Sequence, residues 1–286
     1  MANLFQNHSR DFEGNRYVYP VVSRRSRGLS IGLDLTPQCC SFRCVYCSEL
    51  RGQEATAPAR PIDLPLLRQE LTDMLSFILS GAIFQQPPFD ETPQTHRRLN
   101  DIALSGSGEP TLSPSFEVVC ELIDEVLEAE ARWCEPKVVL ITNATGLHLP
   151  AVQRGLALLD RARVEIWTKL DAGTAAHYAL VNRSKVPFEK VLDNLLTTGR
   201  RRGITIQTLF GALDGQPPSE QEIAAWLGRL KWLESEGAQI DGVQIYTVAR
   251  ATRETSIQAL PDAVLQAIAA RVQALGLKAD WFGSGG

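Results

Sequence analysis

The chain has 286 residues, a formal net charge of -4 and 44% hydrophobic residues. This composition is that of a globular protein, and it excludes a disordered or fibrous chain. The length is sufficient for one large domain or two modest ones, and the charge provides no general attraction to nucleic acid. We find no apolar run long enough for a membrane helix and no signal peptide in the N-terminal segment. We therefore expect a cytoplasmic protein without a membrane partner.

Short apolar, β-branched runs alternate with longer amphipathic stretches along the chain. In chain order, the runs predict strands at Ser30–Leu35, Asp101–Ser105, Lys137–Thr142, Arg163–Lys169, Thr205–Phe210 and Gly242–Val248. The amphipathic stretches predict helices at Leu64–Leu79, Phe116–Glu130, Leu149–Leu159, Phe188–Arg201, Ser219–Glu236 and Asp262–Leu275. This strict alternation predicts a parallel sheet with right-handed crossovers.

Six strand–helix pairs are too few for a complete eight-fold barrel. They predict an α/β fold, a partial (βα)6 TIM-type barrel with a parallel sheet and outer helices; a doubly wound sheet is the alternative. No repeat, long linker or break in composition divides the chain. We therefore predict a single domain over residues 1–286, with an N-terminal extension at 1–27, a partial barrel core at 28–275 and a C-terminal tail at 276–286.

Chemically distinctive residues follow several of the predicted strands. Cysteines follow the first strand, a glycine-rich segment the second, and polar residues the ends of the third, fourth and last. In both candidate architectures ligands bind at the carboxyl ends of the strands. The residues at these ends are Cys40, Cys44, Cys47, Gly108, Glu109, Asn143, Lys169, Asp171, Tyr246 and Arg250.

The cysteine cluster has the spacing C-x-x-x-C-x-x-C at Cys40, Cys44 and Cys47. Three thiolates on one loop chelate a metal with little loss of chain entropy, and clustered cysteines in a reducing cytosol indicate metal binding or catalysis rather than disulfides. A structural zinc site usually needs four ligands, but Cys120 and Cys134 do not form a second pair. Three cysteines on a four-iron cluster leave one iron without a protein ligand, which is the open position of a catalytic metal.

The pattern Cys-x-x-x-Cys-x-x-Cys, with the aromatic Tyr46 before the last cysteine, resembles the signature of the radical S-adenosylmethionine (radical SAM) enzymes. Ser105–Thr111 (SGSGEPT) resembles the Gly-Gly-Glu-type segment of this family. Leu140–Asn143 resembles the end of its third strand, with Ala144 in place of a frequent glycine. Three further segments resemble a single-domain branch related to the wyosine-type tRNA-base synthases, most of whose members have no assigned substrate: Asp34–Pro37, Leu170–Gly173 and Gln244–Arg250.

The resemblance implies a [4Fe–4S] cluster held by Cys40, Cys44 and Cys47, with S-adenosylmethionine bound to the open iron. One-electron reduction would cleave the sulfonium to methionine and a deoxyadenosyl radical, which abstracts a hydrogen atom from substrate. The cofactor carries this chemistry, while the protein orients it and excludes water and oxygen. A one-electron donor such as flavodoxin or ferredoxin is implied as a partner, and Cys39 is interpreted as a spare thiol outside the motif.

The resemblance also implies roles for polar and aromatic residues around the cofactor. Gly108 and Glu109 would meet the methionyl ammonium, because glycine permits close approach and the carboxylate opposes the positive charge. Without a cofactor, the same segment would be a glycine-rich turn whose glutamate favours a helix N-terminus. The other cofactor-binding residues implied are Tyr46, Asn143, Lys169, Asp171 and Tyr246, with Arg250 as a residue for substrate.

Four functions remain open at this point. The first is a radical SAM enzyme that abstracts a hydrogen atom from an unassigned small molecule, peptide or RNA base. tRNA-base modification rests on kinship with the wyosine-type synthases, whereas the chain has a net negative charge and no second cysteine cluster. A glycyl-radical activase would share the cofactor chemistry. A non-catalytic iron–sulfur or zinc binding protein is the alternative from another class.

Overall fold

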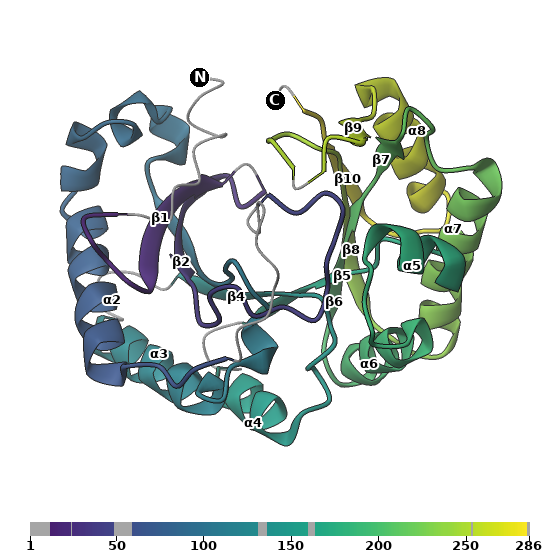
Figure 1. Cartoon of the computed structure of the whole chain (residues 1–286). Coiled ribbons are helices and arrows are strands. Elements are labelled where there is room, and N and C mark those ends of the chain that lie inside the picture. The colour runs from purple at the N-terminus through teal and green to yellow at the C-terminus, as the bar shows by residue number, and fades with distance from the viewer. Residues whose placement is uncertain are drawn as a thin grey trace. The chain divides into compact units, whose positions relative to one another are not determined.

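The computed structural model describes residues 12–23, 25–48, 59–130, 136–159, 164–252 and 254–284 (Figure 1). The chain divides into two compact units. Unit 1 comprises Met1–Cys39, Pro58–Ile141 and Leu149–Glu165, and unit 2 comprises Cys40–Ala57, Thr142–His148 and Ile166–Gly286. The predicted cysteine ligands therefore fall in unit 2, and the glycine-rich segment falls in unit 1.

Unit 1 contains strands in the order β1 (Val18–Ser23), β2 (Gly28–Leu33), β3 (Leu99–Leu104) and β4 (Lys137–Thr142). Strands β2, β3 and β4 are parallel, whereas β1 pairs with β2 in the antiparallel direction. All of β2 is buried, as expected for a parallel strand covered on both faces. The carboxyl ends of the parallel strands therefore share one edge within this unit.

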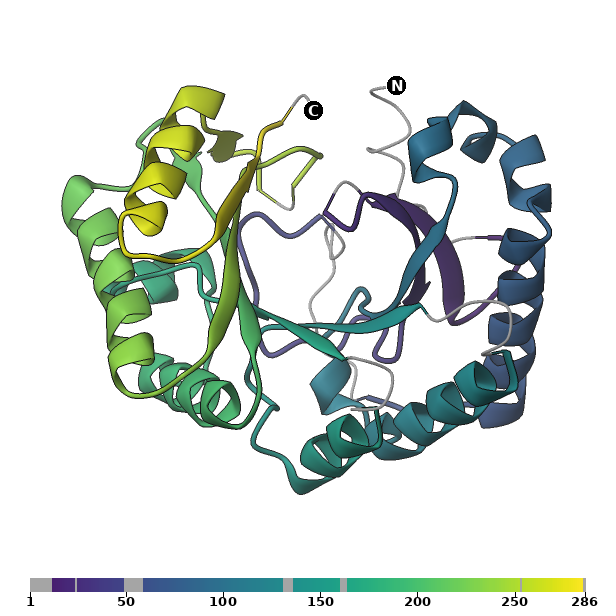
Figure 2. The same ribbon diagram turned by 180° about the vertical axis from the view of Figure 1, so that it is seen from behind.

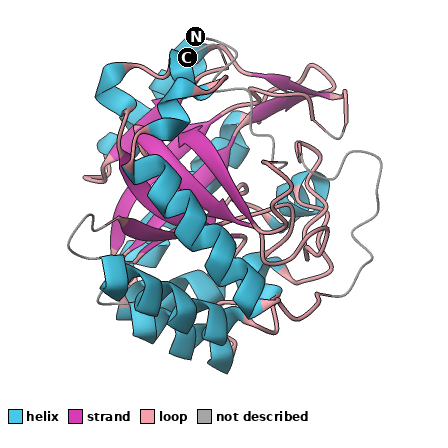
Figure 3. Ribbon diagram, turned by 90° about the vertical axis from the view of Figure 1, so that its left-hand side faces the viewer, coloured by secondary structure: helices cyan, strands magenta, loops and turns pink. Residues whose placement is uncertain are grey.

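The helices of unit 1 lie along one face of its strands (Figures 1 and 3). They are α2 (Leu64–Leu79), α3 (Phe116–Glu130) and α4 (Pro150–Leu158), and short 3-10 turns occur at Ala82–Gln85, Phe89–Glu91, Gln94–His96 and Pro110–Leu112. Asp63 caps the N-terminus of helix α2, and its side chain accepts a hydrogen bond from the Leu66 amide. Helices α3 and α4 lie side by side, and Gly155 permits their close approach at Cys120 and Phe116 (Figure 2).

Unit 2 contains parallel strands in the order β5 (Glu165–Lys169), β6 (Ile204–Leu209), β8 (Ile240–Tyr246) and β10 (Ala279–Phe282). Its helices lie on one side of these strands (Figure 1). They are α5 (Ala175–Val181), α6 (Phe188–Arg201), α7 (Glu220–Ser235) and α8 (Asp262–Gln273). A separate antiparallel pair joins β7 (Gly211–Leu213) to β9 (Ile257–Ala259).

Each predicted strand and helix is present, with ends shifted by a few residues; Arg163, the predicted start of one strand, lies outside the described residues. The sequence analysis missed β1 and β10, which lie in the expected N-terminal extension and C-terminal tail, and the short elements α5, β7 and β9. Strands β7, β9 and β10 have only three or four residues, and β1 contains an internal proline, Pro20, which argues against a strand. The single-domain boundaries stay a prediction.

Candidate functional site

The cysteine loop of unit 2 is fixed by backbone hydrogen bonds to the end of α5. The Arg43 amide donates to the Asn182 carbonyl at 2.8 Å, and the Val45 amide donates to the Val181 carbonyl at 2.9 Å. The ring of Phe42 packs edge-on against Tyr178 in α5 at 5.5 Å between centroids. Helix α5 therefore positions the loop that carries the predicted ligands, although the sequence analysis did not predict this helix.

Two of the three predicted ligand sulfurs accept N–H hydrogen bonds. The Sγ of Cys40 accepts from the Phe42 amide at 3.4 Å and from Asn143 Nδ2 at 3.5 Å. The Sγ of Cys44 accepts from Asn182 Nδ2 at 3.4 Å. Burial, followed by the nearby charge of Asp171, raises the pKa of the Cys44 thiol to about 11.

The three thiol groups of the cysteine loop are chemically suited to bind an iron–sulfur cluster. Thiolates are the usual ligands of such clusters, and hydrogen bonds to the sulfurs are one means by which proteins adjust them. Within the described ranges, however, no group of three or more His, Cys, Asp or Glu side chains is gathered in a way that could hold a metal ion. Ligation by Cys40, Cys44 and Cys47 therefore stays a prediction.

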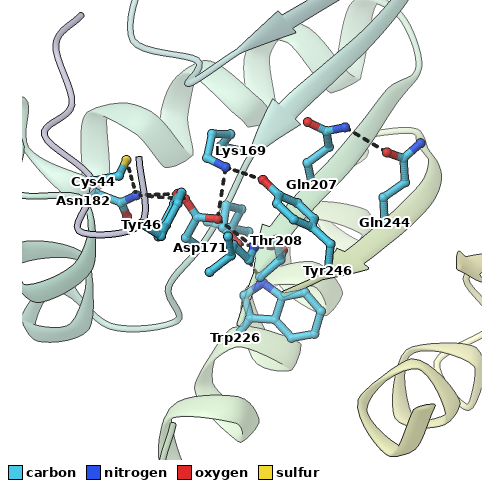
Figure 4. Close-up of polar contacts among 12 residues, drawn as sticks. Cys44, Tyr46, Lys169, Asp171, Asn182, Gln207, Thr208, Trp226, Gln244 and Tyr246 are labelled. Carbon is cyan, nitrogen blue, oxygen red and sulfur yellow. Dashed lines mark hydrogen bonds and ion pairs between the residues drawn. The ribbon is translucent and has the colours of Figure 1, made fainter. Parts of the chain in front are cut away.

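Lys169 lies at the end of β5 between two aromatic rings (Figure 4). Its Nζ is 4.9 Å from the ring centroid of Tyr46 and 5.1 Å from that of Tyr246, and it donates to the Tyr246 hydroxyl at 2.5 Å. It also pairs with Asp171 Oδ1 at 3.5 Å. Burial opposes the lysine charge, but Asp171 and Tyr246 outweigh it, so the pKa of Lys169 is raised. Lys169 is therefore a fixed cation.

The Asp171 carboxylate is fully buried and holds several elements of unit 2 together. Its Oδ2 accepts from the Tyr46 hydroxyl and, at 2.8 Å, from Asn182 Nδ2. Its Oδ1 accepts from the Leu209 amide at 2.9 Å. The preceding turn is fixed because Trp226 and Thr208 each donate a side-chain hydrogen bond to the Leu170 carbonyl at 2.9 Å, as Figure 4 shows. The partners of Asp171 therefore lie in the cysteine loop, at the end of α5, and in strands β5 and β6.

The glycine-rich segment of unit 1 is explained by close backbone approach. A Cβ on Gly108 would lie 1.9 Å from the Thr36 carbonyl oxygen and 2.3 Å from that of Cys39, so no larger residue fits without displacement. The Glu109 amide donates to the Cys39 carbonyl at 2.7 Å. The buried Glu109 carboxylate accepts from the Thr111 amide at 3.2 Å and hydroxyl at 2.5 Å. The role of Glu109 toward a cofactor stays a prediction.

The predicted site residues of unit 2 thus gather around the cysteine loop. Tyr46, Lys169, Asp171 and Tyr246 form one polar and aromatic network, and Asn143 contacts Cys40. Arg250 is half-buried after β8 and stays a prediction for substrate.

Asn182 was missed in the sequence analysis. It follows the short helix α5, and an isolated asparagine after an unrecognised helix gives no signal of its contact with a cysteine. Of the cysteines outside the motif, Cys120 is buried in α3, Cys39 is half-buried, and Cys134 lies outside the described residues. In the described part of the chain, no helix is long and apolar enough to cross a membrane.

The fold resembles that of solved structures. The structure of TYW1 with a lysine-pyruvate adduct bound has a TM-score of 0.58 and 14% identity, covering 92% of this chain and 85% of that chain. The chain has the TYW1 fold. The predicted fold class, α/β of the partial (βα)6 barrel type with a parallel sheet and outer helices, is confirmed. A crystal structure of archaeal TYW1 has a TM-score of 0.47 and 12% identity, covering 96% of this chain and 80% of that one, and this likeness is too low to support an argument.

Sequence comparison gives a more limited match. No family model matches the chain. The UPF0026 protein slr1464 of Synechocystis sp. is 29% identical over 184 residues, which cover 63% of this chain. The matched region spans 58% of that protein's length. The activity, substrate and partners of this chain are therefore matters of proposal.

Proposed function

We propose that this chain is a radical SAM enzyme that holds a [4Fe–4S] cluster through Cys40, Cys44 and Cys47 and abstracts a hydrogen atom from its substrate. The observation that carries this proposal is the three-cysteine loop, in which two sulfurs already accept N–H hydrogen bonds. The fold is consistent with it, because ligands of TIM-type barrels bind at the carboxyl ends of the parallel strands.

The bound cluster would supply electrons for the reductive cleavage of S-adenosylmethionine, and the residues of this chain would bind and orient the cofactor. The Tyr46 ring is held by its hydroxyl bond to Asp171 and by the Lys169 cation, so it presents a fixed aromatic surface for adenine. We assign Glu109 and Gly108 to the methionyl ammonium. Asn143 lies beside Cys40, where its amide contributes to ligand orientation.

Lys169 is proposed as an electrostatic residue and not as a nucleophile. The TYW1 structure with TM-score 0.58 contains a lysine-pyruvate adduct. An amine must lose its proton before it attacks a carbonyl, and the raised pKa of Lys169 opposes this loss. We therefore do not propose that Lys169 forms such an adduct. Its positive charge would instead balance the charge of Asp171 and of an anionic group on the cofactor.

The proposal leaves the substrate as a small molecule, a peptide or an RNA base. tRNA-base modification and glycyl-radical activation remain alternatives within the same chemistry, and no contact in the described residues favours either. The electron would come from a one-electron donor such as flavodoxin or ferredoxin. A non-catalytic iron–sulfur or zinc binding protein is the competing class.

The proposal is tested by anaerobic reconstitution with iron and sulfide, followed by reduction in the presence of S-adenosylmethionine. We expect about four irons per chain and release of 5′-deoxyadenosine. Cys44→Ala should abolish the release, because a cluster with two protein ligands is not held. Cys39→Ala, which removes the adjacent cysteine outside the motif, is the matched control and should retain both iron and activity.

Two outcomes would contradict the proposal. The first is tight zinc binding without iron and without deoxyadenosine, which would support the non-catalytic protein. The second is deoxyadenosine release that persists in Cys44→Ala at the level of the control.

A further inference from the structure

We propose that Asn182 is a positioning residue for the cluster ligand Cys44. Its side-chain amide donates an N–H hydrogen bond to the Cys44 sulfur, which orients the thiolate and stabilises the reduced cluster. The inference rests on the proposed function, since it concerns a ligand of the proposed cluster.

The geometry places the Asn182 amide nitrogen among three groups. Nδ2 lies 2.8 Å from Asp171 Oδ2, 3.4 Å from Cys44 Sγ and 3.4 Å from the Tyr46 hydroxyl oxygen (Figure 4). The nitrogen carries two hydrogens. The short bond to the carboxylate takes one hydrogen, and the second is directed to the side where Cys44 and Tyr46 lie. A thiolate at Cys44 is the stronger acceptor there, because it carries a full negative charge.

Asp171 determines which way the amide points. If the Asn182 amide were rotated by 180°, its Oδ1 would face the Asp171 carboxylate and the Cys44 sulfur. The amide oxygen would then lie against two hydrogen-bond acceptors, which is unfavourable. The observed orientation avoids this repulsion. Because Asp171 is itself fixed by the Leu209 amide and by Lys169, the amide of Asn182 is held rigidly.

The environment of the Asn182 side-chain oxygen indicates that the contacts of its side-chain nitrogen determine why an asparagine occupies this position. Asn182 is 1% exposed, and its Oδ1 has no hydrogen-bond partner among the described residues. Buried polar atoms without partners are uncommon in folded proteins, and each one needs an explanation. An asparagine that leaves its oxygen unpaired is explained by what its nitrogen binds, and one of those groups is a predicted cluster ligand.

A second asparagine is arranged in a similar way at Cys40. Asn143 Nδ2 is 3.5 Å from Cys40 Sγ, and its Oδ1 is held by the Thr145 amide at 3.0 Å and hydroxyl at 2.7 Å. Two predicted ligands thus each accept from an asparagine fixed by other groups. Hydrogen bonds to cluster sulfurs stabilise the reduced, more negative state and raise the reduction potential. Both asparagines should therefore raise the reduction potential of the cluster. We select Asn182 because no sequence motif identified it.

The test is the reduction potential of the reconstituted cluster, followed by electron paramagnetic resonance in an anaerobic redox titration without S-adenosylmethionine. Asn182→Leu removes the donor. We expect its potential to fall by about 30 to 60 mV, which corresponds to a threefold to tenfold shift in a one-electron equilibrium. Asn182→Ser is the second variant: its hydroxyl can still donate near Asp171 but is too short to reach the sulfur, so the same fall is expected.

Gln207→Leu is the matched control, because it also removes a buried side-chain amide from unit 2. The buried Gln207 side chain donates to Gln244 at 2.8 Å, and within the described residues it makes no hydrogen bond to a cysteine. Its cluster should keep the native potential. A purely structural role for Asn182 would lower stability in the variants without moving the potential of the clusters that form.

The outcomes separate this inference from the proposed function. Native potentials in both Asn182 variants, or an equal fall in Gln207→Leu, would overturn the inference while the cluster itself stands. Loss of iron from both variants, with native circular dichroism and with iron retained by the control, would support the positioning role by a second measurement. If the unaltered chain assembles no [4Fe–4S] cluster, the proposed function fails.

Discussion

Two buried carboxylates at predicted cofactor positions are held in different ways. In unit 1, Glu109 accepts hydrogen bonds from the amide and hydroxyl of Thr111, two positions further along the chain. In unit 2, Asp171 accepts from Tyr46, which is 125 positions away, and from the Leu209 amide, 38 positions away, and it pairs with Lys169. The two hydrogen bonds from Thr111 to Glu109 are local, whereas the bonds to Asp171 depend on tertiary structure.

The difference has consequences for what each carboxylate can do. Glu109 accepts hydrogen bonds from the uncharged amide and hydroxyl of Thr111, and a carboxylate interacts favourably with a cationic ligand group. Asp171 already has a buried cation beside it, so its charge serves to hold the cysteine loop, α5 and β6 in place. We therefore expect substitution of Asp171 to affect the fold, and substitution of Glu109 to affect ligand binding.

The largest effect on stability is expected for Asp171→Asn. The change leaves the largely buried Lys169 ammonium without its counter-charge, and loss of one partner of a buried pair costs about 3 kcal/mol. Urea denaturation of the metal-free protein, followed by circular dichroism, measures the change in the free energy of unfolding. Arg68→Gln is the control, because Arg68 pairs with Glu125 on the surface, where such pairs contribute at most about 1 kcal/mol. Equal losses in the two variants would refute the central role of Asp171.

A smaller effect, on binding alone, is expected for Glu109→Gln. The amide oxygen of glutamine can still accept from Thr111, so stability and iron content should stay near native. Loss of the negative charge should weaken S-adenosylmethionine binding about tenfold, or about 1.4 kcal/mol. Equilibrium dialysis with the reconstituted protein measures the affinity. The exposed change Glu125→Gln should leave it unaltered, and an unchanged affinity in Glu109→Gln would remove Glu109 from the cofactor site.

The smallest effect is expected at a third buried carboxylate, Asp101 in β3. Burial raises its pKa and outweighs the hydrogen bond from Ser30. The pKa of Asp101 is higher in the folded state than in the unfolded state, so at pH values between these two pKa values the folded state binds more protons. The free energy of unfolding therefore increases as pH falls through the folded-state pKa. Asp101→Asn should therefore be more stable than the native chain at pH 7, by no more than about 1 kcal/mol.

The pH dependence of that difference provides the check. The advantage of Asp101→Asn should shrink when urea denaturation is repeated at lower pH, where the native aspartate becomes protonated in the folded state. A difference that is constant from neutral to acidic pH, or one of opposite sign, would show that burial does not control this carboxyl.

Periodicity and motif spacing predicted much of the fold and the positions of several candidate site residues. The parallel strands β2 to β6 and β8 were expected because continuous apolar runs alternate with amphipathic helices. The positions of Lys169 and Asp171 at the end of a strand followed from the same pattern. Strand β10 was missed because four residues are too few to show a period, and β1 was missed because the internal Pro20 argues against a strand.

The sequence by itself determined the class of the fold, the three-cysteine spacing and the tight SGSGEPT turn, because each depends on residues close together in the chain. Only the tertiary structure decided that Asn182 contacts Cys44 and that Asp171 joins Tyr46 to Lys169. These contacts form between segments that the folding of unit 2 brings together, and their energies depend on burial and orientation. Neither burial nor orientation can be read from the spacing of residues along a chain.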